Sequence, residues 1–276
     1  MPDQKLSFTH SNGQIDGVYI NAGEDTPLVI IANGHNGFYN YGMFPYIQQS
    51  FLLAGISSYS FNYSHGGVIG DSDYFSDLEK YEQNCIRLEK EDILCAVHNF
   101  ESGQYSKHNK IFLFTHSLGG APTIFATKEI ELSTFNLSGI ILVSTVKTLD
   151  FWGKTMIDKW KETGVYLKKN NRTNQELPLG KEFLDEVINC EDEWSIEKAI
   201  KQLHRPIFIL HGKMDEAVAM ESSLSLYEWS KNNNPKNKLE IIKDATHTFN
   251  TKHPFAGPSV MLNNMIAASI SWIQEN

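Results

Sequence analysis

Short apolar runs of strand length recur along the chain, and segments with helical spacing lie between them. Because strands that alternate with helices favour a parallel sheet, the pattern predicts an α/β fold with a mostly parallel central sheet and helices on both faces. A turn signal at residues 11–14 separates two β-prone runs, so we expect the chain to open with a hairpin of residues 5–9 and 17–21. The other predicted strands are residues 27–32, 56–62, 111–114, 139–143, 205–210 and 238–242.

Three helices have distinct signals. The sequence Ser76-Asp-Leu-Glu79 resembles a capping box, and it predicts a helix whose inward face carries Leu78, Tyr81, Cys85 and Leu88. Amphipathic spacing predicts a second helix around Glu221–Ser230 and a closing helix that runs to Trp272.

The strand–helix pattern is interrupted from about residue 150 to residue 204. Aromatic residues, lysines and asparagines replace it, and Trp152, Met156 and Trp160 recur four residues apart, as on one face of a helix. A stripe of this kind is most often core. We therefore predict one domain, residues 1–276, with an insertion at about 150–204.

Composition narrows the classes of function. The 276 residues include 41% apolar and 21% charged residues, as in ordinary globular proteins. A net charge of −9 argues against nucleic acid or an anionic membrane surface as a partner. Three widely spaced cysteines suggest neither a disulfide framework nor a zinc site. The polar N-terminus lacks the apolar core of a signal peptide, so we expect a cytoplasmic protein.

The segment from Lys110 to Gly120 carries the main chemical signal. Its apolar run ends abruptly at His116 and Ser117, two glycines follow, and a helix-compatible segment begins at Ala121. A strand, a sharp turn with serine at its apex and a helix form a nucleophile elbow, which exposes the serine Oγ above the sheet. Thr115 departs from the G-x-S-x-G pattern, and the alternative is a serine in an ordinary glycine-rich loop.

An acid and a base follow in the order that this chemistry needs. Serine is a weak nucleophile, so it requires an imidazole to accept its proton and a carboxylate to orient the imidazole. Asp215 follows the predicted strand 205–210, and His247 follows the strand 238–242. Three such residues after three separate strands predict a Ser117–His247–Asp215 triad.

Other residues compete for these roles. Asp150 follows the strand after the elbow, where some hydrolases place the acid. Glu216 adjoins Asp215, but we expect it at the surface or at the entry to a helix. His253 precedes a proline and is interpreted as part of a structural turn, and His116 is expected to point into the scaffold.

A tetrahedral intermediate also needs N–H donors for its oxyanion. The backbone of Leu118, directly after the serine, is the first candidate. The second is the backbone of His35 in the loop after strand 27–32, with Asn36 as the alternative. Gly34 and Gly37 would let that loop approach the site closely.

With these motifs placed, the chain resembles the α/β-hydrolase superfamily over nearly its whole length. More narrowly, it is similar to bacterial dienelactone-hydrolase-like and cinnamoyl-esterase-like serine hydrolases. Three further matches are Phe61-Asn-Tyr-Ser-His-Gly66, Asn171-Arg-Thr-Asn-Gln175, and His247-Thr-Phe followed by His253-Pro-Phe255. Departures are Thr115, Asn33-Gly34 in place of a His-Gly pair, and a serine where dienelactone hydrolases use cysteine.

The resemblance implies an α/β-hydrolase fold, a helical cap formed by the insertion, and an esterase or acyl-peptide hydrolase without metal or cofactor. The resemblance also implies the roles of the triad: Ser117 would be the nucleophile, Asp215 the acid and His247 the base.

We therefore predict a serine hydrolase that cleaves small acyl or aryl esters and acts as a monomer or homodimer. An aminopeptidase or acyl-peptide hydrolase with the same triad is the first alternative, and a non-catalytic binding protein on a hydrolase fold is the second. Arg172 is expected either to pair with a substrate carboxylate or to fix the insertion to the body. Four aromatic residues either line an acyl pocket or belong to the core: Phe38, Tyr39, Trp152 and Trp160.

Overall fold

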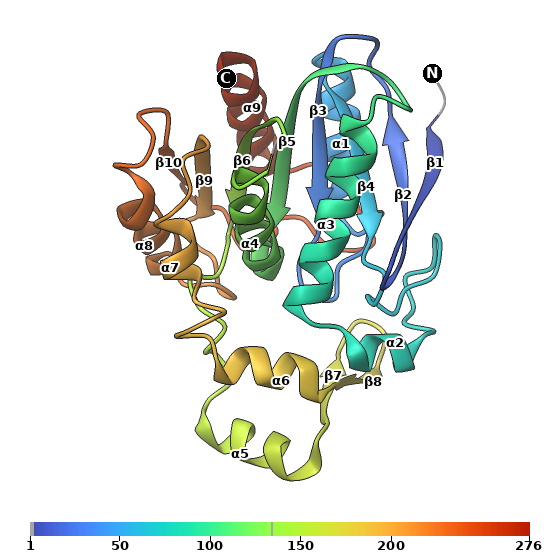
Figure 1. Cartoon of the computed structure of the whole chain (residues 1–276), viewed down its shortest axis with the longest axis vertical. Coiled ribbons are helices and arrows are strands. Elements are labelled where there is room, and N and C mark those ends of the chain that lie inside the picture. The colour runs from blue at the N-terminus through green and yellow to red at the C-terminus, as the bar shows by residue number, and fades with distance from the viewer. Residues whose placement is uncertain (1–2, 134) are drawn as a thin grey trace.

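A mixed sheet of eight strands forms the centre of the molecule in the computed structural model, which describes residues 3–133 and 135–276 (Figure 1). Its strand order is β1-β2-β4-β3-β5-β6-β9-β10. The pairs β1–β2 and β2–β4 are antiparallel and all other pairs are parallel, which confirms the predicted hairpin and the mostly parallel sheet. The strands are β1 Gln4–His10, β2 Gly13–Ile20, β3 Thr26–Ala32, β4 Ser57–Asn62, β5 His108–His116, β6 Leu137–Val143, β9 Ile207–Gly212 and β10 Lys238–Ile242.

Helices cover both faces of the sheet because its central strands are apolar on both sides. In β3, Leu28 and Ile30 belong to one core cluster, whereas Val29 and Ile31 belong to the other. This is the alternation that a strand backbone imposes. Helices α1 and α9 lie behind the sheet in Figure 1, and α3 and α4 lie in front. The main covering helices are α1 Phe44–Leu53, α3 Ile86–Glu101, α4 Gly120–Glu131, α7 Ile196–Ile200, α8 Glu221–Ser230 and α9 Val260–Glu275.

The prediction of one helix through residues 76–88 is wrong. The structure has α2 Leu78–Gln83 and then α3, with Asn84 in an extended conformation between them. Asp77, not Ser76, caps α2 by accepting a hydrogen bond from the Lys80 N–H. Tyr81, Cys85 and Leu88 are buried as expected, but Leu78 is exposed.

A distant carboxylate explains the break between α2 and α3. Glu186 accepts hydrogen bonds from the first two N–H groups of α3, those of Ile86 at 2.6 Å and Arg87 at 2.8 Å. The first N–H groups of a helix have no partner within it, and a carboxylate there also favours the helix dipole. Glu186 therefore starts α3 from a position 100 residues away.

The insertion between β6 and β9 contains α5 Lys154–Thr163, β7 Tyr166–Asn170, β8 Gln175–Leu179 and α6 Lys181–Ile188. Strands β7 and β8 pair as an antiparallel hairpin that the sequence did not predict. In Figure 1 these elements lie beyond the end of the sheet to which β3 and β5 point. Gln175 fixes the hairpin to the body, since its side chain bonds both the N–H and the carbonyl of Phe75.

Across the two described ranges, we find no helix with the length and apolar character needed to cross a bilayer.

Candidate active site

Ser117 lies at a sharp turn between β5 and α4. Its φ is +59°, a left-handed conformation that non-glycine residues rarely adopt. A Cβ on Gly119 would come within 2.3 Å of the Asn33 carbonyl oxygen, and one on Gly120 within 2.1 Å of the Thr145 side chain. Glycine is therefore required at both positions. The turn has the geometry of the predicted elbow, and Thr115, its departure from the pattern, is fully buried.

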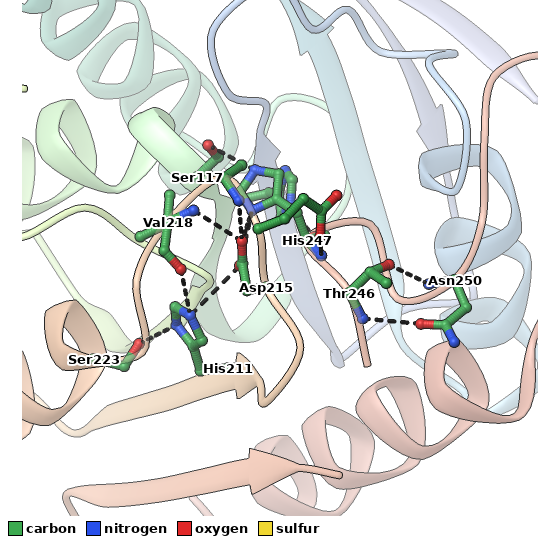
Figure 2. Close-up of polar contacts among 11 residues, drawn as sticks. Ser117, His211, Asp215, Val218, Ser223, Thr246, His247 and Asn250 are labelled. Atoms are coloured by element: carbon green, nitrogen blue, oxygen red, sulfur yellow. Dashed lines mark hydrogen bonds and ion pairs between the residues drawn. The ribbon is translucent and has the colours of Figure 1, made fainter. Parts of the chain in front are cut away.

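The structure brings Ser117, His247 and Asp215 into one hydrogen-bonded chain (Figure 2). His247 Nε2 lies 3.0 Å from Ser117 Oγ. On the other side of the ring, His247 Nδ1 lies 2.8 Å from Asp215 Oδ2 and 3.0 Å from Oδ1. With the proton on Nδ1, Nε2 is free to accept the serine proton, which is the arrangement that general-base activation requires.

The loop after β9 holds the Asp215 carboxylate in place. Its Oδ1 accepts hydrogen bonds from the N–H groups of Ala217 and Val218, at 2.9 and 2.8 Å. Burial by itself raises the pKa of the Asp215 carboxyl, but the hydrogen bonds from His247 and Val218 outweigh it and lower the pKa to about 2. Asp215 is therefore ionised at neutral pH.

His211, at the end of the same strand, supports this loop and was not identified from the sequence. Its Nε2 donates to the Val218 carbonyl oxygen at 3.0 Å and lies 3.4 Å from Asp215 Oδ2. Its Nδ1 then accepts from the Ser223 hydroxyl at 2.7 Å (Figure 2). Burial lowers the pKa of His211, consistent with a neutral ring. The motif His211-Gly-Lys-Met-Asp215 was its only sequence signal.

Two contacts fix the backbone of His247. The His116 ring donates from Nε2 to the His247 carbonyl oxygen at 2.9 Å, and the two ring centroids are 4.6 Å apart. Thr246 and Asn250 exchange two hydrogen bonds of 2.9 Å across the loop. His116 was expected to point into the scaffold. It is buried, but it also lines the cavity at Ser117.

The competing acids and bases lie elsewhere. Asp150 is exposed, and His247 pairs with Asp215 instead. The Glu216 carboxylate is also exposed and accepts only a long, 3.4 Å bond from the His247 N–H. His253 stacks on Tyr41 and accepts a hydrogen bond from the Gly42 N–H, which agrees with its interpretation as a structural residue.

Of the two expected oxyanion donors, Leu118 directly follows Ser117 in the chain, and His35 lies in the wall of the same cavities as Ser117. Leu118 is the second residue of a 3₁₀ turn, Ser117–Gly119, where N–H groups have no helical partner. Within the described ranges, the N–H of His35 donates to no backbone or side-chain acceptor. A Cβ on Gly34 would lie 2.9 Å from the Ser117 Cβ, so this glycine lets the loop pass beside the elbow. The N–H of Asn36, the alternative donor, has no such acceptor in the described ranges either, and the Asn36 side chain accepts a hydrogen bond from Tyr81.

Two cavities meet at His35 and Ser117. The first, of about 260 Å³, has as much polar as apolar surface and includes Asn36, His247, Lys169 and Arg172 in its wall. The second, of about 500 Å³, is more apolar and larger. Its wall includes Leu118, Val146, Phe151 and Val218.

The four aromatic residues proposed for an acyl pocket are buried and lie in the wall of neither cavity. Phe38 packs on Tyr41 and His253, and the Tyr39 hydroxyl donates to Asp71. Trp152 and Trp160 pack on each other with ring centroids 5.6 Å apart. Large aromatic side chains supply much of the buried area that the insertion needs, which explains their position in its core.

No group of three His, Cys, Asp or Glu side chains in residues 3–133 and 135–276 is arranged to hold a metal ion.

We compared the chain with known protein families and with solved structures. No family profile and no curated protein matches the sequence. Est1E from Butyrivibrio proteoclasticus, with ferulic acid bound, is 19% identical over 98% of both chains, with a TM-score of 0.70. The α/β hydrolase GrgF from Penicillium sp. sh18 is 16% identical, with a TM-score of 0.75, over 100% of this chain and 99% of that one. The Pyrococcus furiosus esterase Pf2001 is 17% identical over 99% and 91%, with a TM-score of 0.66. The chain has the α/β-hydrolase fold.

Proposed function

We propose that the protein is a serine hydrolase of carboxylic esters. The observation that carries the proposal is the hydrogen-bonded chain from Asp215 through His247 to Ser117, at a strained turn that opens into two cavities. The esterases among proteins of the same fold support ester cleavage.

The reaction would proceed through an acyl-enzyme. His247 Nε2 takes the proton of Ser117 Oγ as the oxygen attacks the ester carbonyl, and the carbonyl oxygen becomes an oxyanion. The N–H groups of Leu118 and His35 stabilise this charge. His247 then protonates the departing alkoxide and the alcohol leaves. Water attacks the acyl-enzyme with His247 again as base, the bond from the acyl carbon to Ser117 Oγ breaks, Oγ takes the proton back from His247, and the carboxylic acid leaves. Ionised Asp215 keeps the imidazole in the required tautomer and stabilises the imidazolium.

The charges at the site favour this activity over the aminopeptidase alternative. A free α-ammonium group on a substrate calls for a carboxylate nearby, because opposite charges must pair when they leave water. Among the described residues, the walls of both cavities include lysines and an arginine but no aspartate or glutamate. The site is therefore better suited to neutral or anionic substrates.

Hydrolysis of p-nitrophenyl butyrate and of alanine p-nitroanilide tests the proposal. We expect wild type to cleave the ester, to cleave the anilide much more slowly, and to lose nearly all turnover in Ser117→Ala with the same melting temperature. Faster cleavage of the anilide would favour the aminopeptidase. Folded wild type that cleaves neither would favour a binding protein on this fold.

A further inference from the structure

All charged side chains in the walls of the two cavities are basic. Lys169 and Arg172 lie in the wall of the first cavity, and Lys147 and Lys168 in that of the second. The whole chain has 24 lysines and arginines against 33 aspartates and glutamates. Cavity walls whose described charged residues are all basic need an explanation in an acidic protein, since a cavity with charges of one sign attracts ligands of the opposite sign.

The position of His247 assigns the two cavities to the two parts of an ester. The imidazole must protonate the leaving oxygen, so the alcohol departs on the side of the first cavity, whose wall includes His247. Leu118, an expected oxyanion donor, lies in the wall of the second cavity together with Val146 and Phe151. The acyl chain therefore occupies the larger, more apolar cavity, and the alcohol occupies the smaller, less apolar one.

Arg172 is the basic residue of the first cavity with a buried, unused donor. Its Nη1 donates to the Asp73 carbonyl oxygen at 2.6 Å, whereas its buried Nη2 has no hydrogen-bond partner in the described structure. The guanidinium lies 5.0 Å from the Phe38 ring centroid and 5.4 Å from that of Tyr41. Packing against these two rings restricts the orientation of the guanidinium group.

Within the described ranges the Arg172 guanidinium forms no salt bridge with a carboxylate, although the Asp73 carboxylate is near enough to favour its charge. The Asp73 carboxylate, on the residue whose carbonyl Arg172 contacts, instead pairs with His253 Nε2 at 3.2 Å. Burial lowers the pKa of Arg172, because a charge is costly away from water, and the nearby Tyr41 and Asp73 offset this effect only in part. A buried donor without a partner is also unfavourable by itself, and an anionic ligand would relieve both costs.

We propose that the natural substrate is an ester whose alcohol part carries a carboxylate, and that Arg172 binds this carboxylate with help from Lys169. This inference rests on the proposed esterase function and adds the substrate class. A planar guanidinium matches a carboxylate in a way that the single charge of a lysine does not.

Two esters with the same acyl chain and leaving groups of similar size test it: 4-(butanoyloxy)benzoate and 4-(butanoyloxy)benzamide. The measured quantity is the ratio of their kcat/KM values, divided by the ratio of their rates in alkaline hydrolysis to remove the difference in leaving-group reactivity. We expect wild type to prefer the benzoate by about 10-fold or more, because a charge-assisted hydrogen bond discriminates at this level.

We expect Arg172→Gln to remove most of this preference, Arg172→Lys to restore part of it, and Lys147→Gln, in the wall of the other cavity, to keep it. No preference in wild type, or the same preference in Arg172→Gln, would overturn the inference. If wild type hydrolysed both esters equally well and Ser117→Ala hydrolysed neither, the proposed esterase function would stand and only the substrate class would be wrong. Folded wild type that hydrolyses neither ester would remove both proposals.

Discussion

His116 donates from Nε2 to the backbone carbonyl oxygen of His247, 2.9 Å away. Burial lowers the pKa of His116 to about 3, so its ring is neutral at physiological pH and this donor is always present. The residue before the proposed nucleophile thus holds the backbone of the proposed base. His116 acts as a positioning residue, since the contact is to the main chain and not to the reacting atoms.

Replacement of His116 by phenylalanine should therefore slow turnover more than it weakens substrate binding. The aromatic ring remains but the hydrogen bond to His247 is lost, and a small displacement of a catalytic group is enough to cost on the order of 10-fold in rate. Steady-state kinetics with p-nitrophenyl butyrate should give a kcat about 10-fold lower with KM nearly constant. His98→Phe, at an exposed position on α3, is the control. Unchanged kcat in His116→Phe would contradict the positioning role.

Asp215→Asn should lower kcat by about 10³- to 10⁴-fold, as expected when the acid no longer fixes the imidazole tautomer. The asparagine Oδ1 would keep the bonds from the Ala217 and Val218 N–H groups, so its NH₂ would face His247 Nδ1 and favour the wrong tautomer. Asp150→Asn is the matched control and should retain nearly full activity, because Asp150 is exposed and does not pair with His247. A larger loss in Asp150→Asn would reverse the acid assignment.

Glu89 should make the protein less stable as the pH rises. It is buried on α3, and burial raises the pKa of its carboxyl to about 8 from an ordinary value near 4.5. The folded state therefore binds the proton more tightly than the unfolded state, so its stabilising contribution is complete below about pH 4.5 and is lost as the pH rises through 8. At ~1.4 kcal/mol per pKa unit, the difference between 4.5 and about 8 corresponds to a total loss on the order of 5 kcal/mol.

Urea unfolding of wild type and Glu89→Gln at pH 5 and pH 8 measures this effect. In wild type the Asn84 side chain donates a hydrogen bond of 2.8 Å to the Glu89 carboxylate. The glutamine of the variant keeps an oxygen that can accept this bond, and it has no charge to bury. We expect the free energy of unfolding to fall less with pH in Glu89→Gln than in wild type or in the exposed control Glu79→Gln. Equal falls in all three proteins would show that Glu89 does not bury a charge at pH 8.

Features set by local sequence could be predicted. The strands depend on short apolar runs, and each candidate triad residue follows a strand, so chain order alone placed Ser117, Asp215 and His247 at one edge of the sheet. Features set by distant partners could not. The helix break before Ile86 depends on Glu186, and no local signal near residue 84 indicates that a carboxylate 100 residues away caps the second helix.

The predictions for the insertion at about residues 150–204 were the least accurate, because its structure also depends on contacts with distant residues. Its hairpin is held by Gln175 against the backbone of Phe75, a contact that helical or strand periodicity does not encode. Tryptophan is common both in pocket walls and in cores, so the sequence alone could not decide between these positions for Trp152 and Trp160. Both lie inside because their rings pack against Phe183 of α6, each at a centroid distance of 6.0 Å, and against Tyr166 of β7. The wall of the second cavity is instead formed in part by Phe151 and Lys168.

The central claim is that Ser117 is a nucleophile activated by His247. Intact-mass spectrometry after incubation with a fluorophosphonate, on wild type and on Ser117→Ala, tests it most directly, because the reagent forms a covalent bond only with an activated serine and requires no knowledge of the substrate. We expect one adduct on wild type and none on Ser117→Ala. Folded wild type without an adduct, or an adduct that persists in Ser117→Ala, would contradict the claim.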